Sequence, residues 1–109
     1  MNTIKRPKII TKRFKVVAIS TNRGSFGHSG HLLVSEDGIA VEGDRQRNDM
    51  NPTIPNLNRG DVLTFEVDKD GMPKNWIAHH FEYMKPARQG KPSKALLDEI
   101  WSPNFGQTK

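Results

Sequence analysis

The side chains of this sequence whose types and spacing indicate a chemical role are basic ones rather than nucleophiles. The first fifteen residues hold six basic side chains and no acidic one: Lys5, Arg6, Lys8, Lys12, Arg13 and Lys15. Residues 16–84 hold ten acidic and six basic side chains, so the positive charge gathers at the ends of the chain. We expect the six basic residues to hold phosphates, because neutralising a polyanion releases its counterions and favours binding. The alternative is a solvated basic tail.

Several further residues could meet the bases or sugars of a nucleic acid. Residues 21–30 contain three glycines and form a loop in which Phe26 lies beside Arg23 and His28. The Phe26 ring is either a surface on which a base stacks or a cover over the end of the fold. Trp76 belongs either to the binding face or to the core. Three arginines on or beside an irregular segment at 43–60 would extend the phosphate track: Arg45, Arg47 and Arg59.

The four histidines offer a weaker case for a metal site. His79 and His80 are neighbours, which face opposite sides if they lie on a strand, so they do not ligate together readily. The chain has no cysteine, and no carboxylate lies at a recognisable ligand spacing from the histidines. Known nucleophile, phosphate-loop and zinc-hydrolase motifs are also lacking. We therefore expect no metal, no cofactor and no enzymatic activity, with a small hydrolase or metal-binding protein using His28, His31 and His79 as a third possibility.

Short strands joined by tight turns must position these residues. Leu63, Phe65 and Val67 alternate with polar residues, which predicts a strand over 62–67 with one buried face. Asp70 and Gly71 predict a hairpin that leads into a second strand at 75–81. A second Asp-Gly pair predicts a hairpin between strands at 31–35 and 39–42, with Ile39 and Val41 inward, and residues 14–20 suit a first strand. The sequence thus predicts an all-β fold, a small five-stranded antiparallel barrel with a short C-terminal helix.

The two ends of the chain lack the alternating pattern that predicts the strands. Residues 1–13 are expected to form a flexible basic arm, residues 14–84 the barrel, and residues 85–109 a basic linker with the short helix. Ser93 can cap that helix, and Ser102 followed by Pro103 would end it after Trp101. Its apolar side is formed by Leu96, Leu97, Ile100 and Trp101. This side either packs across one end of the barrel or, through Leu97, Ile100 and Trp101, docks a partner protein or a second copy.

Composition limits the class of protein further. No apolar run approaches the roughly 18 residues that a membrane-spanning helix needs, so we expect no membrane partner. The first fifteen residues are basic but have no apolar core, unlike a secretory signal. The lack of cysteine is compatible with a reducing compartment, and we expect the protein to be cytoplasmic.

The stretch from Leu57 to Val67, LNRGDVLTFEV, resembles the entry to the fourth strand of a cold-shock domain. Residues 71–78 look like the last turn and strand of that family, and the resemblance extends more loosely back to Lys15. The family's aromatic motifs are mostly replaced, since Val16 and Val17 stand in the first strand. The resemblance implies an OB-type barrel that binds single-stranded DNA or RNA with weak sequence preference. The alternative is a protein-interaction module, such as an adaptor, assembly subunit or inhibitor, that uses the barrel and the helix at 93–101.

Overall fold

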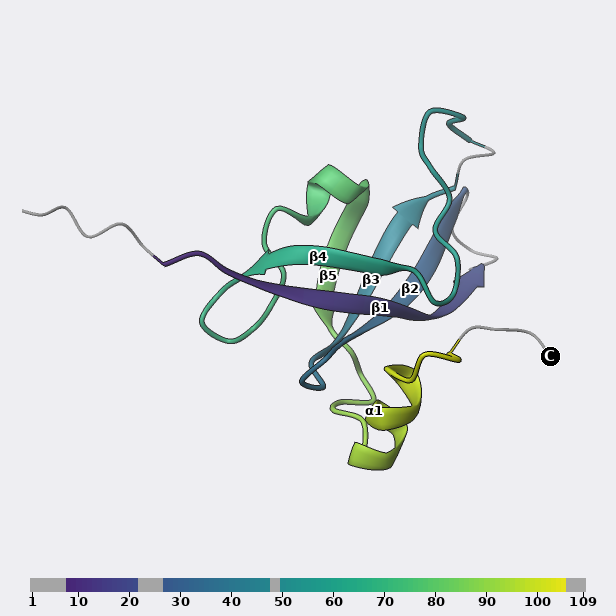
Figure 1. Cartoon of the computed structure of the whole chain (residues 1–109). Coiled ribbons are helices and arrows are strands. Elements are labelled where there is room, and N and C mark those ends of the chain that lie inside the picture. Colours follow the sequence, from purple (N-terminus) through teal and green to yellow (C-terminus); the bar gives the residue numbers. More distant parts are fainter. Residues whose placement is uncertain (1–7, 22–26, 48–49, 106–109) are drawn as a thin grey trace, which may run out of the picture.

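Five antiparallel strands form one curled sheet (Figure 1) in the computed structural model, which describes residues 8–21, 27–47 and 50–105. The strands are β1 (Ile10–Thr21), β2 (His28–Ser35), β3 (Ala40–Gln46), β4 (Val62–Val67) and β5 (Phe81–Pro86). A short 3-10 helix, η1 (Trp76–His79), precedes β5, and α1 (Lys94–Ile100) follows it. The strand order is β4-β1-β2-β3-β5, with β4 and β5 at the two edges. The all-β prediction is confirmed, and the pairing among the described residues makes a half-barrel rather than a closed barrel.

The core lies on the concave face of the half-barrel. Seven buried side chains form it, from all five strands: Phe14, Val16, Leu33, Val41, Phe65, Val67 and Phe81. Phe65 lies at its centre, with ring centroids 5.6 Å from Phe14 and 6.4 Å from Phe81. Val41 faces inward and is fully buried, as its alternation with Glu42 predicts, while Ile39 packs against the core from the hairpin.

The first strand begins earlier than the sequence pattern predicts. Residues 10–13, assigned to the basic arm, pair with β4, where Ile10 lies opposite Val67 and Arg13 opposite Thr64. The lysine and arginine at 12 and 13 do not interrupt the strand, because their charged ends reach solvent while their backbone groups join the ladder. The arm that precedes the sheet is therefore shorter than expected.

The hairpin predicted at Asp70 and Gly71 is wrong beyond its turn. The turn itself forms, since the Asp68 side chain accepts from the backbone N–H groups of Asp70 and Met72. The returning chain makes only one bridge to β4, between Val67 and Pro73, and then enters η1 instead of a strand. Past Pro73 the N–H of Lys74 still donates to the carbonyl oxygen of Glu66 at 2.7 Å, but Asn75 then adopts a positive φ of 56° and the chain enters η1.

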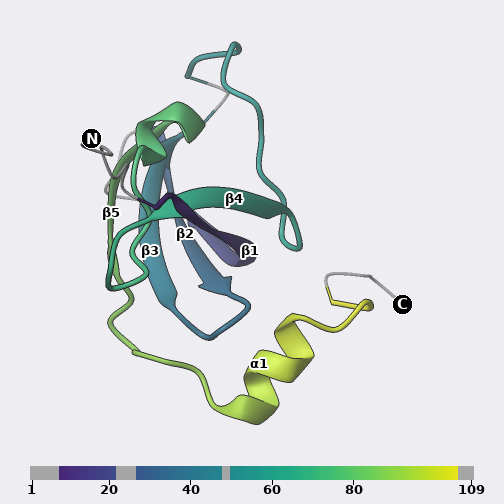
Figure 2. The same ribbon diagram turned by 60° about the vertical axis from the view of Figure 1, so that its left-hand side comes forward.

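The last strand consequently starts at Phe81 and pairs with β3, on the far side of the sheet from β4. Figure 2 shows β4 and β5 on opposite sides of the curled sheet. Trp76 lies in η1 rather than on a strand, and it packs half-buried against the core. Strand β3 also runs on to Gln46, so the irregular segment is shorter than the 43–60 predicted.

The C-terminal helix forms where predicted and lies against the sheet. The Ser93 hydroxyl accepts a hydrogen bond from the N–H of Leu96, and this caps the first turn. Ile100 is 1 % exposed, and the Trp101 indole N–H donates to the carbonyl oxygen of Ser35 at 3.0 Å. The apolar side therefore packs on the chain's own half-barrel. No helix within the described ranges is long and apolar enough to cross a membrane.

Candidate nucleic-acid interface

One end of the concave face opens into a cavity of about 340 Å³, here called the mouth. It is lined by eight residues, from β1, β2, β3 and the irregular segment: Ile19, Ser29, His31, Arg45, Gln46, Arg47, Asn56 and Leu57. Strand parity explains this set, because Arg45 and Arg47 follow Val41 on the core side of β3. Ile19, 39 % exposed, lies opposite His31 in the register of β1 and β2. Past the core, the half-barrel thus ends in a polar opening rather than in packed side chains.

Arg45 is the buried cation of the mouth. It is 4 % exposed; its Nε donates to the carbonyl oxygen of His79 at 3.0 Å and its Nη1 to that of Pro55 at 2.8 Å. The guanidinium also lies 5.7 Å from the centroid of the Phe81 ring. Burial lowers the pKa of Arg45, but arginine remains charged in proteins. Both of these hydrogen-bond acceptors are neutral carbonyls, so they hold the guanidinium in place without neutralising its charge.

The histidines near Arg45 add little charge. Burial, together with the charge of Arg45, lowers the pKa of His31 below its usual 6.5. The same two causes, burial first, lower the pKa of His79. The His31 Nδ1 lies 3.1 Å from the carbonyl oxygen of Ser29, and its ring meets the ring of Phe81 edge-on. Near neutral pH these two histidines therefore add little positive charge beside Arg45.

Three cations expected to bind phosphates interact with groups of the chain itself. Lys12 pairs with Asp37, and Arg13 makes two hydrogen bonds to the carboxylate of Glu36. Lys15 is buried and donates to the carbonyl oxygen of Ile100 at 3.0 Å. Exposed ion pairs of this kind are weak, because water and salt screen them. Lys12 and Arg13 can therefore exchange partners at small cost, whereas α1 covers Lys15.

The other predicted site residues are spread over the molecule. Lys5, Arg6, Arg23 and Phe26 lie outside the described residues, and Lys8 is exposed just before β1. Arg59 donates to the carbonyl oxygen of Val17 at 3.1 Å, and its guanidinium stacks 4.2 Å from the ring centroid of Phe105. Trp76 lies in η1 and is partly buried against the core. Of the predicted binding residues, the structure brings Arg45 and Arg47 together.

The mouth also includes residues that the sequence did not single out. Ser29, Gln46 and Asn56 add neutral hydrogen-bonding groups, and Ile19 and Leu57 add apolar surface. The available signal was that Val41, Arg45 and Arg47 share one parity, which places them on the same side of β3 and its continuation. It was missed because β3 was expected to end at Glu42.

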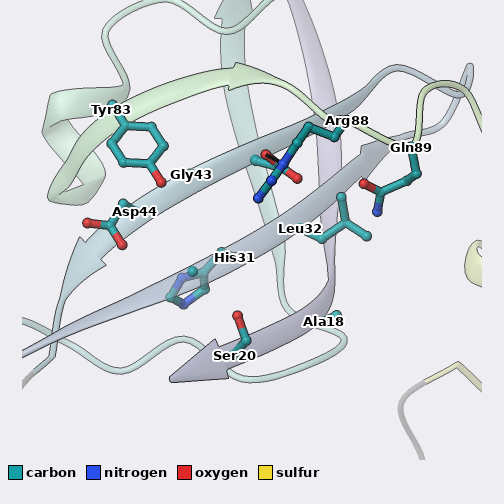
Figure 3. A pocket seen from close by; sticks show the side chains of 11 residues that line it. Ala18, Ser20, His31, Leu32, Gly43, Asp44, Tyr83, Arg88 and Gln89 are labelled. Atoms are coloured by element: carbon teal, nitrogen blue, oxygen red, sulfur yellow. Dashed lines mark ion pairs between the residues drawn. The ribbon is translucent and has the colours of Figure 1, made fainter. Parts of the chain in front are cut away.

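The opposite face of the sheet has a different character. A second cavity, about 480 Å³ and here called the outer cavity (Figure 3), lies over β1, β2, β3 and β5. Its lining includes Glu42 and Asp44, and Arg88 lies 3.7 Å from the Glu42 carboxylate. Two acidic side chains with one paired arginine make this a poorer surface for phosphates than the mouth.

The predicted partner-docking residues lie mainly against the sheet. Ile100 is buried, and Trp101, partly buried, has the side chains of Arg13 and Lys15 over its ring. Leu97 is partly buried as well, while Leu96 is the exposed leucine of the helix. Comparison with known proteins adds no further assignment: the chain matches no family model, and no curated protein or solved structure matches it.

Proposed function

We propose that this protein binds single-stranded DNA or RNA without enzymatic activity, and that the mouth holds the phosphate backbone. The observation that carries the proposal is the convergence of Arg45 and Arg47 in one cavity, beside the neutral hydrogen-bonding side chains of Ser29, Gln46 and Asn56. Arginine is well suited to this task, because its planar guanidinium donates two parallel hydrogen bonds to a phosphate. The proposed ligand is the one expected from the sequence. Its proposed main binding site is the end of the half-barrel rather than the basic arm.

The dimensions and lining of the mouth favour a single strand. A cavity of about 340 Å³ admits a phosphate with part of its nucleotide, whereas a duplex presents its phosphates on a broad convex surface. Ile19 and Leu57 offer apolar contact to a sugar or base, and Ser29 and Asn56 offer hydrogen bonds. Contacts of this kind to phosphate and sugar position a strand without reading its sequence. The expected preference among sequences is accordingly weak.

The fold supports the same ligand class. OB-type barrels are five-stranded and partly open, and they bind oligonucleotides over strands 2 and 3 and the adjoining loops. Here the mouth lies where β2 begins and β3 ends, and the N–H of Arg47 donates to the carbonyl oxygen of Gly27 at 2.6 Å. Gly27, the residue before β2, therefore adjoins the mouth. Fold likeness alone carries no function, so the argument depends on the charge of the mouth.

A charge-reversal experiment tests the proposal. Fluorescence anisotropy with labelled 12-nucleotide DNA and RNA strands, and with duplex DNA of the same sequence, gives the affinity and the strand preference. We expect single strands to bind more tightly than duplex, and Arg47→Glu to abolish most of that binding. Arg88→Glu is the matched control, because it reverses the same charge on the outer cavity. Equal loss in both variants, or duplex binding as tight as single-strand binding, would refute the assignment to the mouth.

A further inference from the structure

Three potential metal ligands meet on the face of the sheet opposite the mouth. His28, Asp44 and Glu82 come from the neighbouring strands β2, β3 and β5, and each can direct one ligand atom so that all three lie within 4.8 Å of one another. The Nε2 of His28 lies 3.0 Å from Oε1 of Glu82. We propose that these three side chains bind a divalent transition-metal ion, with zinc as the ion to be tested first.

An irregularity in strand pairing brings Glu82 to the other two ligands. Arg45 pairs with Phe81, but Asp44 pairs with Tyr83, so Glu82 is an extra residue in β5. Such a bulge redirects side chains and is frequent beside functional sites. Its effect is visible in the burial, because Glu82 and Tyr83 are both exposed whereas Phe81 is buried. In a regular ladder Glu82 would lie opposite Arg45, whose side chain points to the core face.

The charges of the cluster favour a cation. Two carboxylates face one imidazole, so the group carries a negative charge while His28 is neutral. Burial raises the pKa of Asp44, and the nearby charge of Glu82 raises it further, while His28 acts in the opposite direction. A divalent ion would offset the repulsion between the two carboxylates and would favour the deprotonated form of Asp44.

The donor set selects among metals. One imidazole nitrogen with two carboxylate oxygens suits zinc, manganese or cobalt, and the chain has no cysteine to bind a softer ion. Bond lengths of about 2.0–2.2 Å around zinc place neighbouring ligand atoms roughly 3–3.5 Å apart. His28 and Glu82 already have this spacing, so closing the cluster needs a modest movement of the Asp44 carboxylate toward them.

The site would keep a coordination position for a further ligand. Three protein ligands leave the fourth position of a tetrahedral zinc ion to water or another small ligand. Asp44 lines the outer cavity, where Figure 3 shows its carboxylate near the hydroxyl end of Tyr83. A ligand exchanging at the metal would therefore enter from that cavity. This site lies on the opposite face of the sheet from the mouth and is independent of the proposed nucleic-acid binding.

Cobalt spectroscopy on the full-length, tag-free chain tests the metal site after dialysis against a chelator. We expect one equivalent of Co²⁺ to give visible absorption bands that one equivalent of Zn²⁺ abolishes. Glu82→Gln and His28→Ala should each weaken Zn²⁺ binding by tenfold or more in calorimetry. His80→Asn is the control, because it removes an exposed imidazole outside the cluster and places asparagine at a positive φ that this residue tolerates.

The outcomes separate a metal site from a simple histidine–carboxylate ion pair. Absence of a one-to-one cobalt spectrum, or unchanged Zn²⁺ affinity in Glu82→Gln, would refute the proposal. Circular dichroism monitors folding of each variant. If His28→Ala does not fold, Asp44→Asn replaces it, since the amide keeps the shape of the side chain, and an unchanged affinity there would likewise refute the site. Loss of binding in His80→Asn would place the metal elsewhere.

Discussion

Replacing Arg47 by glutamine should lower the slope of the salt dependence of single-strand binding by the amount expected for one phosphate contact. For single strands the logarithm of the binding constant falls with the logarithm of salt concentration by about 0.7 per neutralised phosphate. Two contacts, at Arg45 and Arg47, give a slope of about −1.4, and a fourfold rise in salt then weakens binding about 7-fold. With Arg47 replaced, the contribution of the mouth falls to about −0.7, and the same rise in salt weakens binding only about 2.6-fold. Basic residues of the arm contribute equally to the slopes of the wild type and the variant, so the two slopes still differ by about 0.7.

The assay is fluorescence anisotropy of a labelled single strand at four salt concentrations between about 50 and 200 mM, the range over which counterion release is largest. Arg88→Gln is the matched control, because it removes the same charge from the outer cavity, on the face of the sheet opposite the mouth. We expect this variant to keep the wild-type slope within about 0.2, well below the change expected for one phosphate. The reasoning fails if Arg47→Gln leaves the slope unchanged, or if Arg88→Gln lowers it as much.

Three further predictions concern stability. Arg45→Met removes the donor for two backbone carbonyl oxygens and should lower the free energy of unfolding by about 2–4 kcal/mol; a loss below about 0.5 kcal/mol in urea unfolding contradicts the role of Arg45. Trp101→Phe removes the hydrogen bond to Ser35 but keeps an aromatic ring, and should cost about 1 kcal/mol; an unchanged melting temperature argues against docking of the helix through this bond. The pKa of His31 is depressed in the folded state, so the unfolded state binds more protons below its usual 6.5. The contribution of His31 to stability is therefore fully present above pH 6.5 and is lost as the pH drops below that value. The free energy of unfolding of His31→Phe, measured in urea titrations, should fall less between pH 7.5 and 5 than that of the wild type. An identical fall in both proteins would contradict the role given to His31.

Local sequence patterns predict the elements that are determined by interactions between residues close together in the chain. The alternation around Phe65 and the serine cap at Ser93 appear in the structure as predicted. The turn at Gly38 forms as well, with a φ of 92° that glycine adopts without strain, and joins β2 to β3. The pairing of β5 was missed because its partner, β3, is about forty residues away along the chain. A strong Asp-Gly turn at 70–71 favoured a neighbouring partner, but the chain leaves β4 at Asn75, whose φ is positive, and enters η1.

The candidate sites were harder to predict for the same reason. Arg45 and Arg47 were selected for their charge, but the prediction placed them on a loop, where nothing would direct both into one cavity. The partners of Lys12 and Arg13 lie 25 and 23 residues along the chain, on the tip of another hairpin. Histidine spacing likewise suggested a set with His31, whereas the structure gathers carboxylates around His28 across three strands. Side chains that meet through strand register leave no fixed spacing in the sequence.

The pleat of β3 separates the two proposed sites. Glu42 and Asp44 project to the outer cavity, whereas Arg45 and Arg47 line the mouth. Because strand residues alternate between faces, this order gives β3 and the residue that follows it an acidic side and a basic side. Under the two proposals, a phosphate backbone would bind at the concave end and a metal ion on the opposite face. A slip of one residue in β3 would bring acidic side chains to the mouth and arginines to the metal ligands, so both proposed sites depend on the same strand register.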